Sequence, residues 1–338
     1  MPKVRSQMVP ISLAIISTIM VMAALYFMKP VLMPFVFALF IYFLMSPLID
    51  YMNQKLRIPR LLAVSLSCVG VILLVVGVAA FIFVSMRIIV SDMDIYLREI
   101  SNFLDRTAVL IQCKGMTIDM TILKRYLDEV PVIDWVANIS GKILAVLGNL
   151  LLILIYTFFL LAGKTEGDDV MTQDVQLSIN RYLTAKCLIS ILTGIIVWGT
   201  LSFFEIPMAF MFGVVTVILH FIPNLGAIIA NILPIPVILL KYGYGVEFLI
   251  SMSIITTSQI FIGNILDPKL MGDNLGLHPA IVLLSLLFWG FLWGISGMFL
   301  AVPITAVIKL AMAKSTTLKP VAEFMEGKFI SGPSKVKQ

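Results

Sequence analysis

Charged residues are scarce in this chain of 338 residues. They make up 13% of it, against about a quarter of an average soluble protein, whereas hydrophobic residues make up 60%. The mean hydropathy is +1.05. So little charge cannot cover a soluble surface, and apolar runs of about 20 residues, which a bilayer core requires, recur along the chain. The composition therefore predicts a polytopic membrane protein with the lipid bilayer as its surroundings.

The residues that usually build enzyme sites are also few. The three cysteines have no metal-type spacing, and the two histidines, His220 and His278, are isolated in the sequence. The chain contains no Walker motif, no GxSxG and no HExxH. We therefore expect no enzyme activity, no disulfide framework, no metal site and no cofactor. The net charge of +5 comes with lysines spread among short loops and a tail, which favours membrane orientation over nucleic-acid binding.

The order of apolar and polar stretches predicts an all-α transmembrane bundle with about eight spans, including possible re-entrant hairpins. Residues 1–86 are predicted to form a three-span unit. Residues 87–140 combine mixed charges with apolar residues at helical spacing, which indicates an extracytoplasmic amphipathic helical segment. That segment is either a gate or assembly collar, or a solvated connector. Residues 141–315 are predicted to form a transport core with interrupted helices, and residues 316–338 a basic cytoplasmic tail.

Positive charge predicts the orientation of the chain. Lys55, Arg57 and Arg60 lie between the second and third predicted spans, whereas Lys29 is the only charge between the first two. Cytoplasmic loops carry an excess of lysine and arginine, which places the N-terminus in the cytoplasm. The lysines of the tail place the C-terminus there too.

Two stretches have similar patterns, residues 206–241 and 278–309. Each opens with proline, continues apolar for about 15 to 18 residues, breaks at glycine, meets a second proline and ends in lysine. The predicted spans give the two stretches opposite orientations. Interrupted apolar segments at corresponding positions indicate a transporter binding site near the bilayer midplane. Two ordinary pairs of spans are the alternative interpretation.

Candidate site residues are polar groups at membrane depth and the glycines and prolines that interrupt the helices, because both are expensive in hydrocarbon. Their ordinary roles are snorkelling anchors at helix ends, turn residues and helix-packing hydrogen bonds. The transport pathway is predicted to include His220, Pro223, Asn224, Gly226, Gln259, Asn264, Asp267, Gly294, Ser296 and Gly297. A role in gating or coupling is predicted for Arg181, Lys186 and Glu205.

Several of these motifs together resemble a known family. They are Arg181-Tyr182 before a span, FIPNLGAIIA at 221–230, the segment 259–269 with DPKLMG at 267–272, LHPAIVLLSL, and GISGMFLAVPITAVIK at 294–309. This combination is similar to the autoinducer-2 exporter family of bacterial membrane proteins, the PerM-like permeases, over roughly residues 10–315. The resemblance implies a secondary transporter of the bacterial inner membrane that does not hydrolyse ATP and that assembles as a homo-oligomer. It also implies export of a quorum-sensing signal in some members and sodium or proton antiport in others.

Three functions remain open. The first is export of a small polar solute, such as a quorum-sensing signal, through a cavity between interrupted helices. The second is antiport of a monovalent cation and a proton, with Asp267, His220 or Glu205 as the titrating group. The third is a non-transporting membrane scaffold whose segment 87–140 binds a partner.

Overall fold

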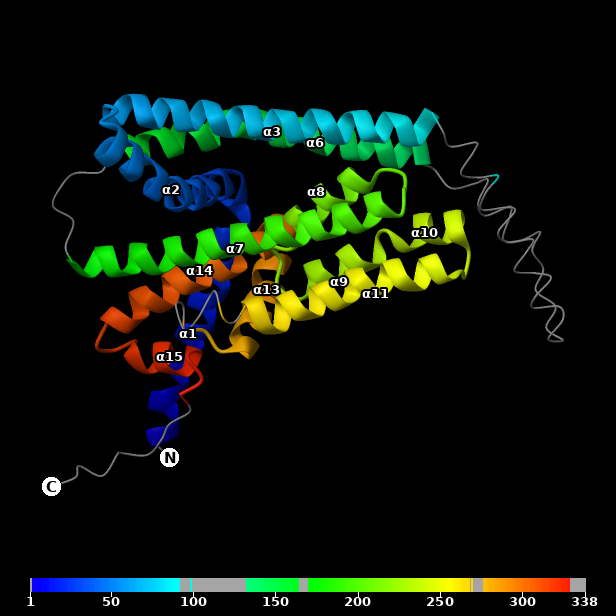
Figure 1. The fold of residues 1–338 in the computed structure, drawn as a ribbon. Helices are drawn as coiled ribbons and strands as arrows, with labels where there is room; N and C mark the ends of the chain where they lie inside the picture. Colours follow the sequence, from blue (N-terminus) through cyan, green and yellow to red (C-terminus); the bar gives the residue numbers. More distant parts are fainter. Residues whose placement is uncertain are drawn as a thin grey trace, which may run out of the picture. The chain divides into compact units, whose positions relative to one another are not determined.

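The computed structural model describes residues 2–91, 98, 132–163, 170–267, 269 and 276–328. Every regular element in these ranges is a helix, which confirms the all-α prediction (Figure 1). The predicted segment 87–140 falls mostly outside the described residues, as does the end of the tail, so the domain boundaries stay a prediction. The helices are α1 (Pro2–Phe27), α2 (Lys29–Leu56), α3 (Arg60–Ser91), α6 (Val132–Ala162), α7 (Val170–Phe203), α8 (Ala209–Leu219), α9 (Leu225–Ile232), α10 (Ile235–Tyr242), α11 (Val246–Phe261), the π-helix η1 (Ile262–Leu266), α13 (Pro279–Trp293), α14 (Ile295–Lys314) and α15 (Lys319–Met325).

Six stretches in the described part of the chain are long and apolar enough to cross a bilayer. Four shorter apolar helices of 10–17 residues accompany them, so the chain is a multi-span membrane protein. The long stretches are Lys29–Leu56, Arg60–Ser85, Gln176–Phe203, Leu225–Tyr242, Val246–Leu266 and Ile295–Lys314, and the shorter ones are Ile16–Phe27, Leu147–Ala162, Ala209–Leu219 and Pro279–Trp293.

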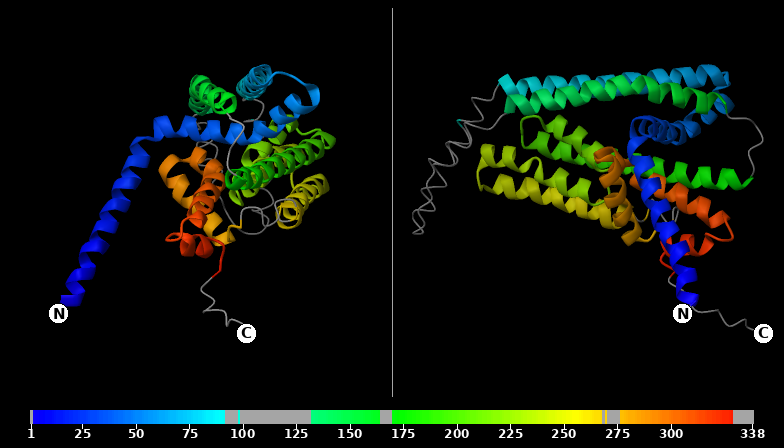
Figure 2. Two further views of the ribbon diagram at one scale, coloured as in Figure 1. Left: turned by 90° about the vertical axis from the view of Figure 1, so that its left-hand side faces the viewer. Right: turned by 180° about the vertical axis from the view of Figure 1, so that it is seen from behind.

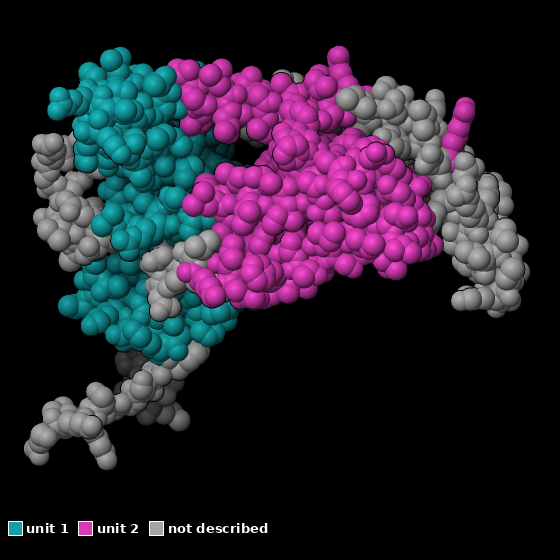
Figure 3. Space-filling view, viewed as in Figure 1, with its two compact units in different colours: residues 1–68, 150–185, 271–338 teal, residues 69–149, 186–270 magenta. Residues whose placement is uncertain are grey.

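The chain divides into two compact units, which Figure 3 colours separately. Unit 1 consists of residues 1–68, 150–185 and 271–338, and unit 2 of residues 69–149 and 186–270. Helices α3, α6 and α7 contribute residues to both units.

Unit 1 is held together by apolar packing and by an arginine that caps the C-terminal end of a helix. Ile49, Ala63, Val64 and Leu161 form a buried cluster. The guanidinium of Arg60 donates two hydrogen bonds, of 3.1 and 2.9 Å, to the carbonyl of Leu161 near the C-terminal end of α6. A basic side chain is favourable there because the last carbonyls of a helix have no partner within it.

Unit 2 is built around short helices that follow the long helix α7. Its buried cluster draws Val197 and Leu201 from α7, Phe212 from α8, Ile238 from α10 and Ile255 from α11, among others. Helices α10 and α11 contact each other and run side by side, as Figure 1 and the right-hand view of Figure 2 show. The short helices result from turn residues, because Pro223 and Asn224 separate α8 from α9 and Pro234 separates α9 from α10.

The described part of each unit contains a tight helix hairpin at one of the predicted glycine breaks. In unit 2, α8 and α9 pack against each other, and a Cβ on Gly226 would overlap the carbonyl oxygen of Leu219. In unit 1, α13 and α14 pack against each other, and a Cβ on Gly297 would overlap the carbonyl oxygen of Trp289. Both predicted glycine breaks are therefore places where one helix starts against the last turn of the previous one.

Helix α15 of unit 1 is held against α14 and the start of α13 by polar contacts. The ammonium of Lys309 lies 2.6 Å from Oε1 of Glu326, and that of Lys328 lies 2.8 Å from Oε2. The backbone N–H of His278 donates to the carbonyl of Met325 at 2.9 Å. Both oxygens of Glu326 are thus paired, which fixes the end of α15.

Replacement of Gly226 by alanine is expected to destabilise the protein by about 1–3 kcal/mol, because the added methyl group must push α9 away from α8. The matched control is Gly199→Ala in α7, where a Cβ would meet nothing within 4 Å. Alanine favours a helix over glycine, so the control should match or exceed native stability. Unfolding of purified protein in detergent measures both changes. Equal losses in the two variants would contradict close packing at Gly226.

The docking of α15 is expected to weaken in acid. Hydrogen bonds from Lys309 and Lys328 lower the pKa of Glu326 from its ordinary value of 4.5. A lowered pKa in the folded state means that the stabilisation is complete above the ordinary value and is lost as the pH falls through the folded-state pKa. Amide-exchange protection of residues 319–325, corrected for the intrinsic rate, should therefore drop below about pH 4.5.

Glu326→Gln should show reduced protection of α15 at every pH. The exposed Glu323 lies on the same helix, so Glu323→Gln should keep the native profile. Unchanged protection in Glu326→Gln would show that the two ion pairs do not hold α15.

Candidate functional site

A buried lysine lies within a candidate membrane span. Lys186 belongs to the 28-residue stretch Gln176–Phe203 of α7, and its side chain is 5% exposed. Its Nζ donates to Oδ2 of Asp267 at 3.1 Å. A lone charge in an apolar environment is costly, so the ammonium and the carboxylate each depend on the other.

Asp267 is positioned by the π-helix η1 (Ile262–Leu266). Its backbone N–H donates to the carbonyl of Ile262, five residues earlier. Such turns are rare and are frequently found at functional sites. The helix therefore changes its pitch immediately before the carboxylate, whose side chain is 20% exposed.

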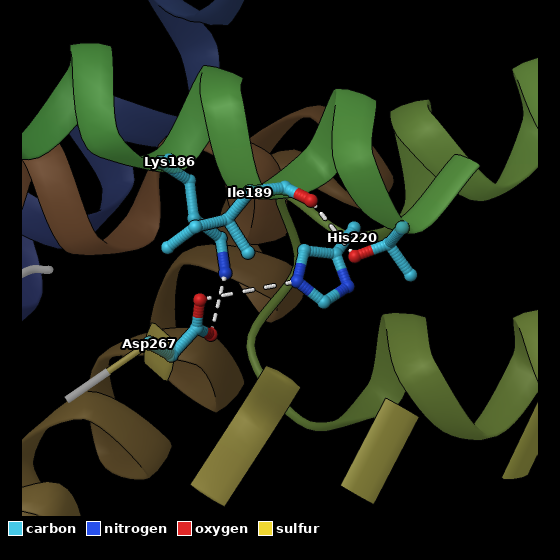
Figure 4. Close-up of polar contacts among 5 residues, drawn as sticks. Lys186, Ile189, His220 and Asp267 are labelled. Carbon is cyan, nitrogen blue, oxygen red and sulfur yellow. Dashed lines mark hydrogen bonds and ion pairs between the residues drawn. The ribbon is translucent and has the colours of Figure 1, made fainter. Parts of the chain in front are cut away.

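His220 comes to the same carboxylate from the end of α8. Its backbone N–H donates to Thr216 at 2.9 Å, which closes the last turn of the helix. Its Nε2 lies 4.0 Å from Oδ1 of Asp267, which is too long for a direct hydrogen bond. Figure 4 shows the Lys186 ammonium and the His220 ring beside the same carboxylate, each joined by a dashed line to one of its oxygens. One oxygen is thus paired with lysine, and the other faces the imidazole.

Unit 2 contains buried polar atoms that find no hydrogen-bond partner within the described part of the chain. Native proteins pair the large majority of such atoms, so an unpaired group calls for an explanation. The Thr193 hydroxyl, by contrast, donates to the Ile189 carbonyl of its own helix at 2.8 Å. The unpartnered atoms are Oγ of Ser190, Nε2 of His220, Oδ1 of Asn231, both amide atoms of Gln259, and Oδ1 of Asp267.

Three of the residues predicted from the sequence, Lys186, His220 and Asp267, are brought together by the structure. A fourth, Gln259, is buried on α11 with 3% exposure. The roles proposed for these residues stay predictions.

Other predicted residues of unit 2 lie in different surroundings. Asn224 is exposed at the start of α9, beside the half-buried Pro223. Asn264 is exposed and donates to the Ile260 carbonyl of its own helix at 3.0 Å. Glu205 is 87% exposed and lies 3.8 Å from the ammonium of Lys241.

The remaining predicted residues belong to unit 1. Arg181 is exposed on α7. Gly294 separates α13 from α14 and has a φ of +69°, a value that favours glycine, and Ser296 and Gly297 lie in the first turn of α14.

Sequence reasoning missed Ser190 and Asn231. Ser190 follows Lys186 by four positions on α7, so the two share one face of the helix. This spacing was a usable signal once Lys186 was considered buried rather than snorkelling. Asn231 lies one position before the end of α9, and nothing in its sequence context distinguishes it from a turn residue.

Known proteins share this sequence over nearly its full length. The model of a family described as AI-2E family transporter matches residues 15–316. The chain belongs to the AI-2E family of transporters. It is 29% identical over 318 residues to the AI-2 transport protein TqsA of Escherichia coli K12, covering 90% of this chain and 92% of TqsA.

Two further relatives have similar coverage. A putative transport protein of Haemophilus influenzae is 29% identical over 322 residues, covering 90% of this chain and 92% of the relative. The putative transport protein YhhT of Escherichia coli K12 is 25% identical over 315 residues, covering 89% of this chain and 90% of YhhT. As a member of the AI-2E family, the protein is a membrane-spanning transporter of a small solute.

Replacing one residue of the Lys186–Asp267 pair is expected to lower the stability of the protein much more than replacing both. Lys186→Met or Asp267→Leu alone leaves one buried charge without a partner, which should destabilise the protein by about 3–5 kcal/mol. The double variant removes both charges and should recover most of that loss. Unfolding of the four proteins in detergent gives the coupling free energy.

The exposed pair Lys241–Glu205 is the matched control. Its coupling free energy should be about 0–1 kcal/mol, because water screens it. Additive losses at Lys186 and Asp267 would mean that the two side chains do not interact.

Proposed function

We propose that this protein is a secondary transporter that exports a small polar solute across the bacterial inner membrane, with both termini in the cytoplasm. The buried cluster of Lys186, His220 and Asp267 is its coupling site. The solute class is that of a quorum-sensing signal such as autoinducer-2, the solute after which the relative TqsA is named. We further propose that the protein works as a homo-oligomer.

The observation that carries this proposal is a lysine buried within one candidate span and paired with the carboxylate that follows the end of another. Lys186 is 5% exposed and lies 3.1 Å from Asp267. Ionisable groups at membrane depth are expensive and mark solute pathways and proton relays. Two of the three residues follow the ends of interrupted helices, α8 and η1, the arrangement that transporters use around a midplane site.

The arrangement offers a way to couple binding to movement. Opening the Lys186–Asp267 pair leaves two uncompensated charges, so another group must replace the lost partner. His220, when protonated, is placed to do so at Oδ1. A solute hydroxyl is a second candidate, since Oδ1 accepts hydrogen bonds. Exchange of partners at Asp267 would then favour one arrangement of the helices over another.

A second candidate function is antiport of a monovalent cation and a proton. The specific observation that favours it is the unpartnered Oδ1 of Asp267, an anionic oxygen near a titratable imidazole. The carboxylate would accept a cation in one state and a proton in the other.

Proteoliposomes containing the purified full-length protein test the proposal. Release of trapped autoinducer-2, measured with a reporter strain, should be at least tenfold slower for Asp267→Asn and Lys186→Met than for the native chain, because each variant loses the charge pair. Lys241→Met removes one partner of an exposed pair in the same unit and should remain within twofold of native.

A pH-sensitive dye with imposed sodium or potassium gradients separates the two functions. Ion-dependent proton movement that disappears in Asp267→Asn, together with no release of autoinducer-2, would replace export by antiport. Equal autoinducer-2 release by native, Asp267→Asn and empty vesicles would contradict the export proposal.

A further inference from the structure

The π-helix brings the polar side chains of Gln259 and Asp267 onto one face of their helix. Gln259 and Asp267 are eight positions apart, which in a regular α-helix would separate them by about 80° around the axis. A π turn holds one residue more than an α turn. Because η1 (Ile262–Leu266) contains this extra residue, the rotation from Gln259 to Asp267 equals that of seven α-helical positions. Seven positions are close to two full turns. Gln259 therefore lies on the Asp267 face of the helix.

The facing helix α7 repeats this arrangement. Ser190 follows Lys186 by four positions and lies on the same face, one turn further along. Its side chain is 0% exposed, and its hydroxyl has no hydrogen-bond partner among the described residues. Since Lys186 contacts Asp267, the two faces that meet carry one ion pair and, beyond it, an amide and a hydroxyl.

Beyond the ion pair, these polar groups do not form the hydrogen bonds with one another that a structural network would contain. Gln259 is 3% exposed, and neither its amide oxygen nor its amide nitrogen is bonded within the described part of the chain. A buried amide without partners costs free energy, which a purely structural position would avoid by carrying an apolar residue. The unpartnered amide, hydroxyl and imidazole therefore point to a ligand that supplies the missing hydrogen bonds.

The balance of charge indicates what that ligand is. Lys186 and Asp267 neutralise each other, so an added ion would leave an uncompensated charge in a buried site. The unpartnered groups include acceptors, the oxygens of Asp267 and Gln259, and groups that donate, the amide nitrogen and the serine hydroxyl. A solute hydroxyl both donates and accepts, and so matches this set.

We propose that Ser190 and Gln259 are solute-contacting residues of the Lys186–Asp267 site, and that they select an uncharged solute with at least two hydroxyl groups over a charged one. This inference rests on the proposed function. It adds two binding residues and the charge of the solute to it.

Binding to the full-length protein in detergent tests the proposal, with ribose as the uncharged probe and ribose 5-phosphate and sodium as the charged ones. The native protein should bind ribose at least tenfold more tightly than ribose 5-phosphate and should show no saturable sodium binding. Gln259→Leu and Ser190→Ala should each weaken ribose binding by about tenfold or more, because each removes hydrogen bonds in a desolvated site.

A matched control is present in unit 2. Ser251 is also 0% exposed, but its hydroxyl donates to the Phe248 carbonyl at 3.1 Å. Ser251→Ala should therefore bind ribose within twofold of native.

Stability provides a readout that a structural role would not give. Gln259→Leu keeps a similar volume and removes two unpartnered polar atoms, so its unfolding temperature should rise while its affinity falls. A lower unfolding temperature with unchanged ribose affinity would overturn the proposal. So would native protein that binds neither sugar, or binds ribose 5-phosphate as tightly as ribose.

The flux assay separates this inference from the proposed function. Autoinducer-2 release that requires Asp267 but is unchanged in Gln259→Leu and Ser190→Ala would support the proposed function and contradict a solute-contacting role for Gln259 and Ser190. Release that does not depend on Asp267 would contradict both proposals.

Discussion

The backbone of a membrane-spanning chain must satisfy its hydrogen bonds internally, and the interrupted helices of this protein do so with little loss. At each break the next N–H groups still bond to the previous turn. His220 donates to Thr216 at 2.9 Å, Leu233 to Ile229 at 2.9 Å, and Gly294 to Gly290 at 2.8 Å. A short helix can therefore end at membrane depth without leaving a row of bare carbonyls. This constraint decides where polar side chains can be placed in the structure.

The breaks explain how three ionisable groups meet in unit 2. Lys186 comes from an uninterrupted part of α7, whereas His220 and Asp267 follow the ends of α8 and η1. A side chain in the middle of a regular helix is fixed by the helix axis, but one at a break takes its position from the turn. Lys186 therefore keeps its position when a turn changes its conformation. His220 and Asp267 would move with the turn and could exchange their partners.

Part of this arrangement was predictable from the sequence because its causes are local. Long apolar runs predict spans, and Gly226 and Gly297 predict hairpin turns, since each effect acts within a few residues. The partner of Lys186 was not predictable, because Asp267 lies 81 positions away and the bond depends on tertiary packing. The π-helix was missed for another reason. One inserted residue in η1 shifts the helical phase without changing the apolar character of the run, so hydropathy does not reveal it.

Two buried lysines of this chain show how an ion pair that holds structure differs from one that can serve a site. Lys309 pairs with Glu326, and the second oxygen of that carboxylate is taken by Lys328. Asp267 has one oxygen paired with Lys186, while its other oxygen faces His220 across a distance longer than a hydrogen bond. A carboxylate with both oxygens occupied gains nothing from a new partner, whereas one with a free oxygen does. The Lys309–Glu326 pair of unit 1 therefore has a structural role, whereas the Lys186–Asp267 pair of unit 2 can accept a further hydrogen bond. The number of partners at the carboxylate distinguishes the two pairs.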